Sequence, residues 1–193
     1  NEFFVKYVRT KRPFVILKCA ATLDGYIAAS TGDSKWVTGP VARKHVHHFR
    51  HAVDAIMVGI GTVRADDPRL TTRLDGLRTA DPLRVILDTR LSIPKQAAVL
   101  NQNSDSDTLI VCSDKMPRDR IEQVESYGAQ VMTLPQKGVR LSLDTLMNRL
   151  GAKGVTSLLI EGGSRVAGSA LAEGAVDKIN FFYAPKILGG GGI

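Results

Sequence analysis

Short apolar runs alternate with helical patterns along almost the whole chain, and this alternation limits the fold more than any other feature of the sequence. Hydrophobic side chains stand at consecutive positions in most of these runs, as is typical of strands that helices cover on both faces. The runs lie at residues 14–21, 55–59, 84–89, 109–113, 130–134, 157–160 and 178–184. Their order predicts a three-layer α/β domain with a largely parallel central sheet flanked by helices.

Helix signals occupy four of the connecting segments. Pro40 suits the first turn of a helix that carries Ala42, Val46, Phe49 and Val53 on one face. The other three helices are predicted at 117–127, at 142–150 and from Ser164 to Gly174.

A strand-to-helix turn at residues 157–168 is the most informative local motif. It joins the run SLLI to Glu161, two glycines and Ser164, which is a good N-cap residue. Adjacent glycines allow positive φ and a close approach to bare main chain, and the first amide groups of a helix are unpaired. The turn therefore suits a nucleotide pyrophosphate. A tight turn without any ligand is an equally open interpretation.

Several polar residues fall at the carboxyl ends of the predicted strands, where open parallel sheets bind their ligands. They are Lys18, residues 59–62, Thr89 and Glu161, and we expect them to share one cleft. Lys18 is either a site residue or a strand-end residue that reaches solvent. The charged segment 66–73 is interpreted as a solvated loop.

Two further motifs resemble known sites but fail on their details. Gly59 and Gly61 begin like a dinucleotide fingerprint, but Arg64 stands where the third glycine is needed. His47 and His51 lie one helical turn apart without a glutamate or a third ligand, so a solvated helix face is favoured over a metal site.

The net charge is +7, but Lys and Arg are not clustered and aromatic residues make up only 6%, which argues against nucleic-acid binding. Spread positive charge suits small phosphorylated ligands. The sequence contains no apolar run long enough to cross a bilayer, and Cys19 and Cys112 resemble buried thiols of a reducing compartment. We therefore expect a cytoplasmic protein without a membrane partner.

Both ends of the sequence suggest a piece of a longer chain. Residues 1–13 are polar and basic and are interpreted as a linker remnant, and the tail from Lys186 stops in a glycine run, so that residues 14–193 form a domain that is incomplete at its C-terminus.

Six motifs occur in order: KCAATLDG from Lys18, GDSKW from Gly32, GIGTVRADD from Gly59, VILDT from Val85, EGGS from Glu161 and APK from Ala184. Together the motifs resemble the reductase domain of the bacterial bifunctional riboflavin-biosynthesis deaminase/reductase. The resemblance covers practically the whole chain. It implies a dihydrofolate-reductase-like fold and NADPH-dependent reduction of 5-amino-6-(5-phosphoribosylamino)uracil, in a homodimer or higher homo-oligomer that follows a deaminase domain.

The resemblance also implies residue roles. The NADPH site would be lined by Ala20, Trp36, Thr62, Asp66, Thr89, Gly163, Ser164, Arg165, Val166, Ala167, Gly168 and Ser169. The substrate would be contacted by Ser34, Arg50, Leu70, Arg73 and Glu161. Arginine side chains can hold a phosphate through forked bonds.

Hydride transfer from the nicotinamide to C1′ of the ring-opened sugar is the implied reaction, with Lys18, Asp66 and Glu161 as the candidate catalytic residues. The alternative interpretation of Lys18 is a phosphate or carbonyl contact without acid–base work. The zinc cluster that deamination requires is absent from the sequence, so we expect no deaminase activity. The rival interpretations are a reductase of another pteridine- or pyrimidine-like substrate and a nucleotide-binding module without turnover.

Overall fold

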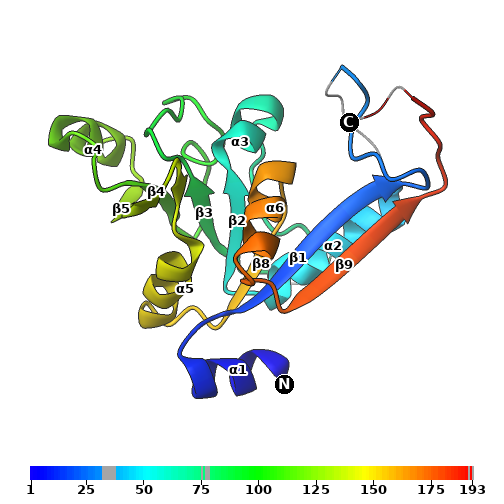
Figure 1. Cartoon of the computed structure of the whole chain (residues 1–193), viewed down its shortest axis with the longest axis horizontal. Coiled ribbons are helices and arrows are strands. Elements are labelled where there is room, and N and C mark those ends of the chain that lie inside the picture. The colour runs from blue at the N-terminus through cyan, green and yellow to red at the C-terminus, as the bar shows by residue number, and fades with distance from the viewer. Residues whose placement is uncertain (32–37, 75, 77–78, 191, 193) are drawn as a thin grey trace.

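A seven-stranded sheet forms the centre of the computed structural model, which describes residues 1–31, 38–74, 76, 79–190 and 192 (Figure 1). The strand order is β5-β4-β3-β2-β8-β1-β9, and every pairing within this sheet is parallel. Its strands are β1 (Phe14–Thr22), β2 (Ala55–Gly59), β3 (Leu83–Leu87), β4 (Thr108–Ser113), β5 (Gln130–Leu134), β8 (Ser157–Ile160) and β9 (Lys178–Ala184). All seven predicted strands are confirmed.

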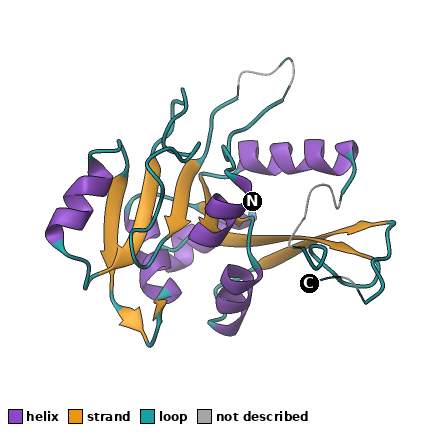
Figure 2. Ribbon diagram, turned by 90° about the horizontal axis from the view of Figure 1, so that it is seen from above, coloured by secondary structure: helices purple, strands orange, loops and turns teal. Residues whose placement is uncertain are grey.

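Helices cover both faces of the sheet, which gives the three predicted layers (Figure 2). The helices are α1 (Glu2–Thr10), α2 (Pro40–Ala52), α3 (Ile60–Asp66), α4 (Arg118–Glu125), α5 (Leu143–Ala152) and α6 (Ser164–Ala172). On one face, Leu146 of α5 and Val166 of α6 join the larger apolar cluster. On the other face, Val63 of α3 and Val124 of α4 join a second cluster, and Phe49 of α2 packs on a third.

The outer half of β1 has only β9 as a neighbour, because β8 pairs with residues 14–17 alone. Phe49 of α2 packs edge-on against Phe182, with ring centroids 6.3 Å apart, and so covers one face of this two-stranded extension. Its other face exposes Ile179, Phe181 and Tyr183. The structure thus leaves an apolar surface at the sheet edge.

The lead-in, which the sequence suggested to be a linker remnant, contains the helix α1. Tyr7 Oη donates to the carbonyl of Gly151 at 3.0 Å, and the Phe3 ring lies 5.4 Å from that of Phe14. Lys6 also forms an ion pair with Asp177. These contacts hold α1 against the body of the domain.

Local boundaries differ from the sequence predictions in three places. Helix α4 ends at Glu125 and is followed by turns, so it is shorter than the predicted 117–127. Residues 60–66 form α3, a helix that was not predicted. A small hairpin of β6 (Gln136–Lys137) and β7 (Arg140–Leu141) was not predicted.

The C-terminal segment folds back onto the loop after β1. The amide groups of Leu188 and Gly189 both donate to Asp24 Oδ2, at 2.9 and 2.8 Å. The hydrogen bond from the Thr22 hydroxyl, with smaller contributions from these two main-chain bonds, lowers the pKa of Asp24. Within the described residues, no helix has the length and apolar character needed to cross a membrane.

Candidate active site

A cleft of about 1520 Å³ opens at the carboxyl ends of β1, β2, β3 and β8. The four features predicted to converge there do so, because Lys18, residues 59–62, Thr89 and Glu161 all line it. Pockets for one small ligand usually measure about 300–1000 Å³. This cleft is therefore large enough for an extended ligand and a second molecule beside it.

The turn between β8 and α6 forms part of the wall of the cleft. Gly163 has φ +74° and is the N-cap residue, so Ser164 is the first helical residue and not the N-cap that the sequence suggested. The amide groups of Val166 and Ala167 both donate to the carbonyl of Gly163, at 3.1 Å. The amide groups of Ser164 and Arg165, the first two of α6, have no hydrogen-bond partner among the described residues and remain available as donors.

The turn has no room for side chains at its glycines. A Cβ on Gly162 would lie 3.0 Å from Thr62 Oγ1, and a Cβ on Gly59 would lie 2.9 Å from Val166 Cγ2. The main chain at these glycines is thus packed directly against the side chains of Thr62 and Val166. Such a bare elbow with free amide groups fits the pyrophosphate of a dinucleotide cofactor.

Arg50 of α2 and Glu161 after β8 form an ion pair in the cleft. Arg50 Nε and Nη2 donate to Glu161 Oε1 and Oε2 at 2.7 and 2.8 Å, and the two side chains are only 12% and 7% exposed. Arg50 Nη1 also donates to the carbonyl of Thr71 at 2.9 Å. Burial opposes the charge of Arg50, but the Glu161 carboxylate outweighs it and the pKa of Arg50 is raised.

This ion pair changes what Arg50 can do for a ligand. The forked edge of its guanidinium group, which the sequence offered to a phosphate, is occupied by Glu161. Each terminal nitrogen keeps one further N–H bond to donate. Arg73 is also in the lining, and no hydrogen bond or ion pair of its exposed side chain is described, so its guanidinium group could offer two parallel N–H bonds to a phosphate.

The segment 66–73 forms a wall of the cleft. Its charges had suggested a solvated loop, but part of the segment is buried and hydrogen-bonded to other parts of the domain. Leu70 has φ +55° and is only 3% exposed. Asp67 accepts a hydrogen bond from the amide of Ala98 at 2.7 Å, and the amide of Arg73 donates to His47 Nδ1 at 3.2 Å. Only the outer side chains of the segment face solvent.

Positive charge dominates the lining of the cleft. Three acidic side chains (Asp66, Asp67 and Glu161) face eight basic ones, which are Lys18, Arg43, Arg50, Arg64, Arg69, Arg73, Arg140 and Arg165. This excess raises the local concentration of anionic ligands. It fits the +7 net charge and the expectation of a phosphorylated ligand.

Lys18 and Asp66 lie at different parts of the lining. Lys18 is half-buried on β1, and its Nζ is 6.0 Å from the centroid of the Phe182 ring. Asp66 is exposed at the end of α3. Their positions allow either residue to face a ligand in the cleft.

Most residues of the predicted site line the cleft. They are Lys18, Ala20, Arg50, Thr62, Asp66, Leu70, Arg73, Thr89, Glu161, Gly163, Ser164, Arg165, Val166, Ala167 and Ser169. Gly168 lies exposed on α6 and is not part of the lining. Ser34 and Trp36 lie outside the described residues.

His47 and Arg140 are among the lining residues that sequence reasoning missed. His47 was interpreted as part of a solvated helix face, but its ring accepts the Arg73 amide. Arg140 of the unpredicted hairpin donates to Ser169 Oγ at 3.1 Å. His47 had a signal, since it shares a helical face with Arg43 and Arg50; Arg140 had none. Among the described side chains, no three His, Cys, Asp or Glu residues are grouped to hold a metal ion.

Comparisons with known proteins agree with this geometry. Residues 13–193 match the family model of the RibD C-terminal domain. The riboflavin biosynthesis protein RibD of Actinobacillus pleuropneumoniae is 39% identical over 98% of this chain and 50% of the relative. The 2,5-diamino-6-ribosylamino-4(3H)-pyrimidinone 5′-phosphate reductase of Methanothermobacter thermautotrophicus is 41% identical over 93% of this chain and 81% of the relative.

Solved structures show the same likeness. A deaminase/5-amino-6-(5-phosphoribosylamino)uracil reductase from Thermotoga maritima has a TM-score of 0.80 and 36% identity, over 98% of this chain and 50% of that one. Acinetobacter baumannii RibD has a TM-score of 0.85 and 31% identity, over 100% and 51%. This confirms the dihydrofolate-reductase-like fold, and the chain spans about half the length of the RibD relatives that it matches. The chain belongs to the RibD C-terminal domain family.

Proposed function

We propose that this chain reduces the ribosyl group of 5-amino-6-(5-phosphoribosylamino)uracil to the ribitylamino product of riboflavin biosynthesis, with NADPH as cofactor. The observation that carries the proposal is a single cleft that holds both the Gly162–Gly163 elbow and the Arg50–Glu161 pair. One suits a dinucleotide and the other a polar, phosphorylated second ligand. Relatives that are named as reductases of such a substrate support the assignment.

The elbow and α6 would hold the cofactor. The first amide groups of α6 would donate to the pyrophosphate, and Thr62, Thr89, residues 165–167 and Ser169 would line the rest of its site. When bound, the cofactor supplies the hydride. The bulk of the protein's contribution is orientation of the two ligands.

Arg73 and the Arg50–Glu161 pair would hold the substrate. Arg73 would take the phosphate through its fork, and Arg50 would add one N–H bond while fixing Glu161. Glu161 would then accept a hydrogen bond from the substrate's amine. Leu70 would pack against the substrate from the wall of the cleft.

Proton movement would accompany the reduction. Ring opening transfers the N–H proton of the sugar amine to the ring oxygen and leaves an imine; C1′ then accepts the hydride, and one further proton restores the N–H bond. Lys18 and Asp66, both in the lining, are the groups that we assign to this proton traffic. In the overall reaction, each substrate molecule takes up one hydride and one proton.

The test follows NADPH absorbance in the presence of the deaminated substrate and, separately, of its 2,5-diaminopyrimidinone counterpart. Turnover of the first, with a product two hydrogens heavier by mass spectrometry, is the expected result. Turnover of only the second would identify a reductase with the other substrate. NADPH binding without any substrate-dependent oxidation would overturn the proposal in favour of a nucleotide-binding module.

The surroundings of the reductase are also part of the proposal. Because the RibD relatives are about twice as long, we propose that a deaminase domain accompanies this domain in the full-length chain.

The apolar surface of Ile179, Phe181 and Tyr183 supports a homodimer or higher homo-oligomer. Two unpaired cysteines fit a cytoplasmic location. Sedimentation of the wild type and of Phe181→Ser tests the oligomer, which should dissociate in the variant.

A further inference from the structure

A buried arginine that takes no part in the proposed reaction lies behind the cleft. Arg84 of β3 is only 3% exposed, and burial lowers its pKa against the opposing influence of Asp81 and Asp107. Its Nε donates to Thr108 Oγ1 and its Nη1 to Ser104 Oγ, both at 2.9 Å. Burying a charge costs free energy unless the charge is paired and hydrogen-bonded. The partners of Arg84 therefore form a connected polar network around it.

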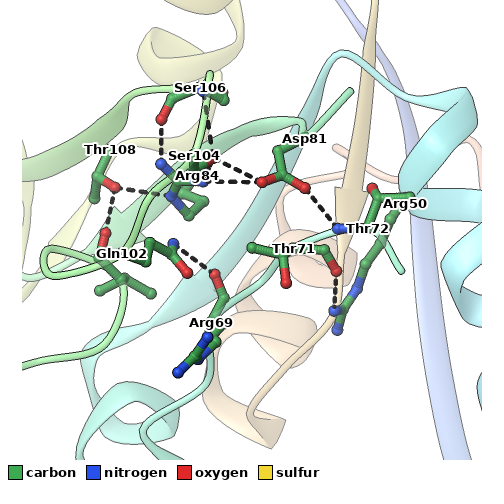
Figure 3. A network of polar contacts seen from close by, with 11 residues as sticks. Arg50, Arg69, Thr71, Thr72, Asp81, Arg84, Gln102, Ser104, Ser106 and Thr108 are labelled. Carbon is green, nitrogen blue, oxygen red and sulfur yellow. Dashed lines mark hydrogen bonds and ion pairs between the residues drawn. The ribbon is translucent and has the colours of Figure 1, made fainter. Parts of the chain in front are cut away.

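Asp81 connects this arginine to the substrate side of the molecule, as Figure 3 shows. Its Oδ2 accepts a hydrogen bond from Ser104 Oγ at 2.6 Å and lies 4.0 Å from Arg84 Nη1. Its Oδ1 accepts the main-chain amide of Thr72 at 2.7 Å. One carboxylate therefore joins Arg84 to the segment 69–73.

The cleft side of that segment makes the contacts on which the substrate depends. The carbonyl of Thr71 fixes Arg50 Nη1, and the amide of Arg73 donates to His47. A second fastening lies at the other end, where Gln102 Nε2 donates to the carbonyl of Arg69 at 2.9 Å (Figure 3). Thr72 stands between the two cleft contacts, so its tether sets where both of them lie.

We infer that Asp81 is a positioning residue for the substrate. Ser104 and Arg84 hold the Asp81 carboxylate, and the carboxylate holds the amide of Thr72. This contact fixes the positions from which Arg73 and the Arg50–Glu161 pair would contact the substrate. This inference rests on the proposed function. Asp81 itself is not in the lining of the cleft; it is bonded to the segment 69–73, and its charge also helps to raise the pKa of Arg50. The cofactor elbow begins at Gly162, directly after Glu161, and among the described hydrogen bonds none joins the elbow itself to Asp81 or to the segment 69–73.

The test compares Asp81→Asn with Asp107→Asn. Both changes remove one carboxylate that influences Arg84, but Asp107 bonds to the Gln130 side chain and not to the segment 69–73. Asp81→Asn should raise the KM of the substrate about tenfold, leave kcat within about twofold and leave the Kd of NADPH unchanged, as expected when about 1.4 kcal/mol of uniform binding is lost. Asp107→Asn should change none of these.

A double-mutant cycle separates positioning from general destabilisation. If Asp81 acts by placing Arg73, then Asp81→Asn should raise KM much less in an Arg73→Ala background than in the wild type. Equal effects in both backgrounds, or an unchanged KM in the single variant, would overturn the inference.

Hydrogen exchange gives a readout that does not need turnover. Asp81→Asn should speed exchange of the amide groups in residues 69–73, and Asp107→Asn should not. If the wild type shows no reductase activity, the proposed function fails while this exchange result still reports on the tether. If the wild type is active and exchange is unchanged in Asp81→Asn, the inference alone fails.

Discussion

Arg50 and Glu161 meet across the cleft in a two-point ion pair, with Nε–Oε1 at 2.7 Å and Nη2–Oε2 at 2.8 Å, although 111 residues separate them in the chain. The pair joins α2 to the end of β8. It occupies the forked edge of the Arg50 guanidinium group and fixes both oxygens of the Glu161 carboxylate. The pair thus joins two distant parts of the chain, and it is also part of the proposed substrate site.

Arg50→Met should destabilise the protein by about 3 kcal/mol, because it leaves the Glu161 carboxylate without its partner in a largely buried position. Urea unfolding monitored by circular dichroism measures this change. Arg118→Met is the matched control, since the Arg118–Glu122 pair is exposed and should contribute less than about 1 kcal/mol. Equal losses in the two variants would show that burial adds nothing to the Arg50 pair.

The glycine elbow gives a second prediction, which concerns the cofactor. Gly163→Ala places a Cβ at φ +74° and 3.4 Å from Thr62 Oγ1, so the turn should be strained by about 1–2 kcal/mol and the Kd of NADPH should rise about tenfold or more. Isothermal titration calorimetry with NADPH measures the effect.

Gly168→Ala is the control on the same helix. A Cβ there meets nothing within 4 Å, and Gly168 is interior to α6, so the change should stabilise the protein by about 0.5–1 kcal/mol and leave NADPH binding unchanged. Weaker NADPH binding in Gly168→Ala would restore Gly168 to the cofactor site that the resemblance implied.

Lys18→Ala should lower kcat by about 100-fold or more and leave the Kd of NADPH within about twofold, if Lys18 takes part in proton transfer. Steady-state kinetics and cofactor titration give the two numbers. Lys44→Ala removes an exposed lysine of α2 and should change neither. An unchanged kcat in Lys18→Ala would remove Lys18 from the mechanism.

Those features that local sequence determines were predicted well. Consecutive apolar residues identified each strand of the sheet, and the bounds of β9 were predicted without error. The predicted start of the helix at 142 is confirmed, since Ser142 is the N-cap of α5 and its Oγ accepts the amide of Thr145. Convergence at the cleft followed from parallel strands alone, because their carboxyl ends must meet at one edge.

What sequence reasoning missed depends on contacts between distant residues. Helix α1 is held by Phe14 and Gly151, which give no signal in residues 1–13. The Arg50–Glu161 pair and the Asp81 tether likewise join separate parts of the chain. Ser164 was misplaced by one position, because Gly163 adopts positive φ and takes the N-cap itself.

The two cysteines should differ in reactivity. Burial raises the pKa of Cys112 to about 11, with Asp88 and Asp114 adding to the shift, and the side chain has no exposed surface. Cys19 is half-buried, and its pKa is raised by burial while Lys18 opposes the shift. A disulfide reagent at pH 8 should modify Cys19 first and Cys112 only after unfolding, as peptide mapping would show. Modification of Cys112 in the native protein would contradict the packing around β4.

His47 should remain neutral to lower pH than an ordinary histidine. Burial lowers its pKa, and Arg50 and Arg73 lower it further, whereas Glu161 and the carbonyl of Thr71 oppose the shift. Its Nδ1 accepts the Arg73 amide, which only the neutral ring can do. Proton NMR titration should show one ring resonance with a midpoint below about 6.5, and that resonance should vanish in His47→Asn.

The sign of the linked stability follows from the same shift. The unfolded chain takes up the His47 proton near pH 6.5 and the folded chain only at lower pH, so this contribution to stability is complete above about 6.5 and is lost as pH falls toward the lowered pKa. Unfolding free energies of the wild type should therefore decline more steeply below pH 6.5 than those of His47→Asn.

A phosphate bound at Arg73 would favour the protonated ring and should move the His47 midpoint upward when the substrate is added. A midpoint that does not respond to a saturating phosphorylated substrate would place the phosphate elsewhere in the cleft.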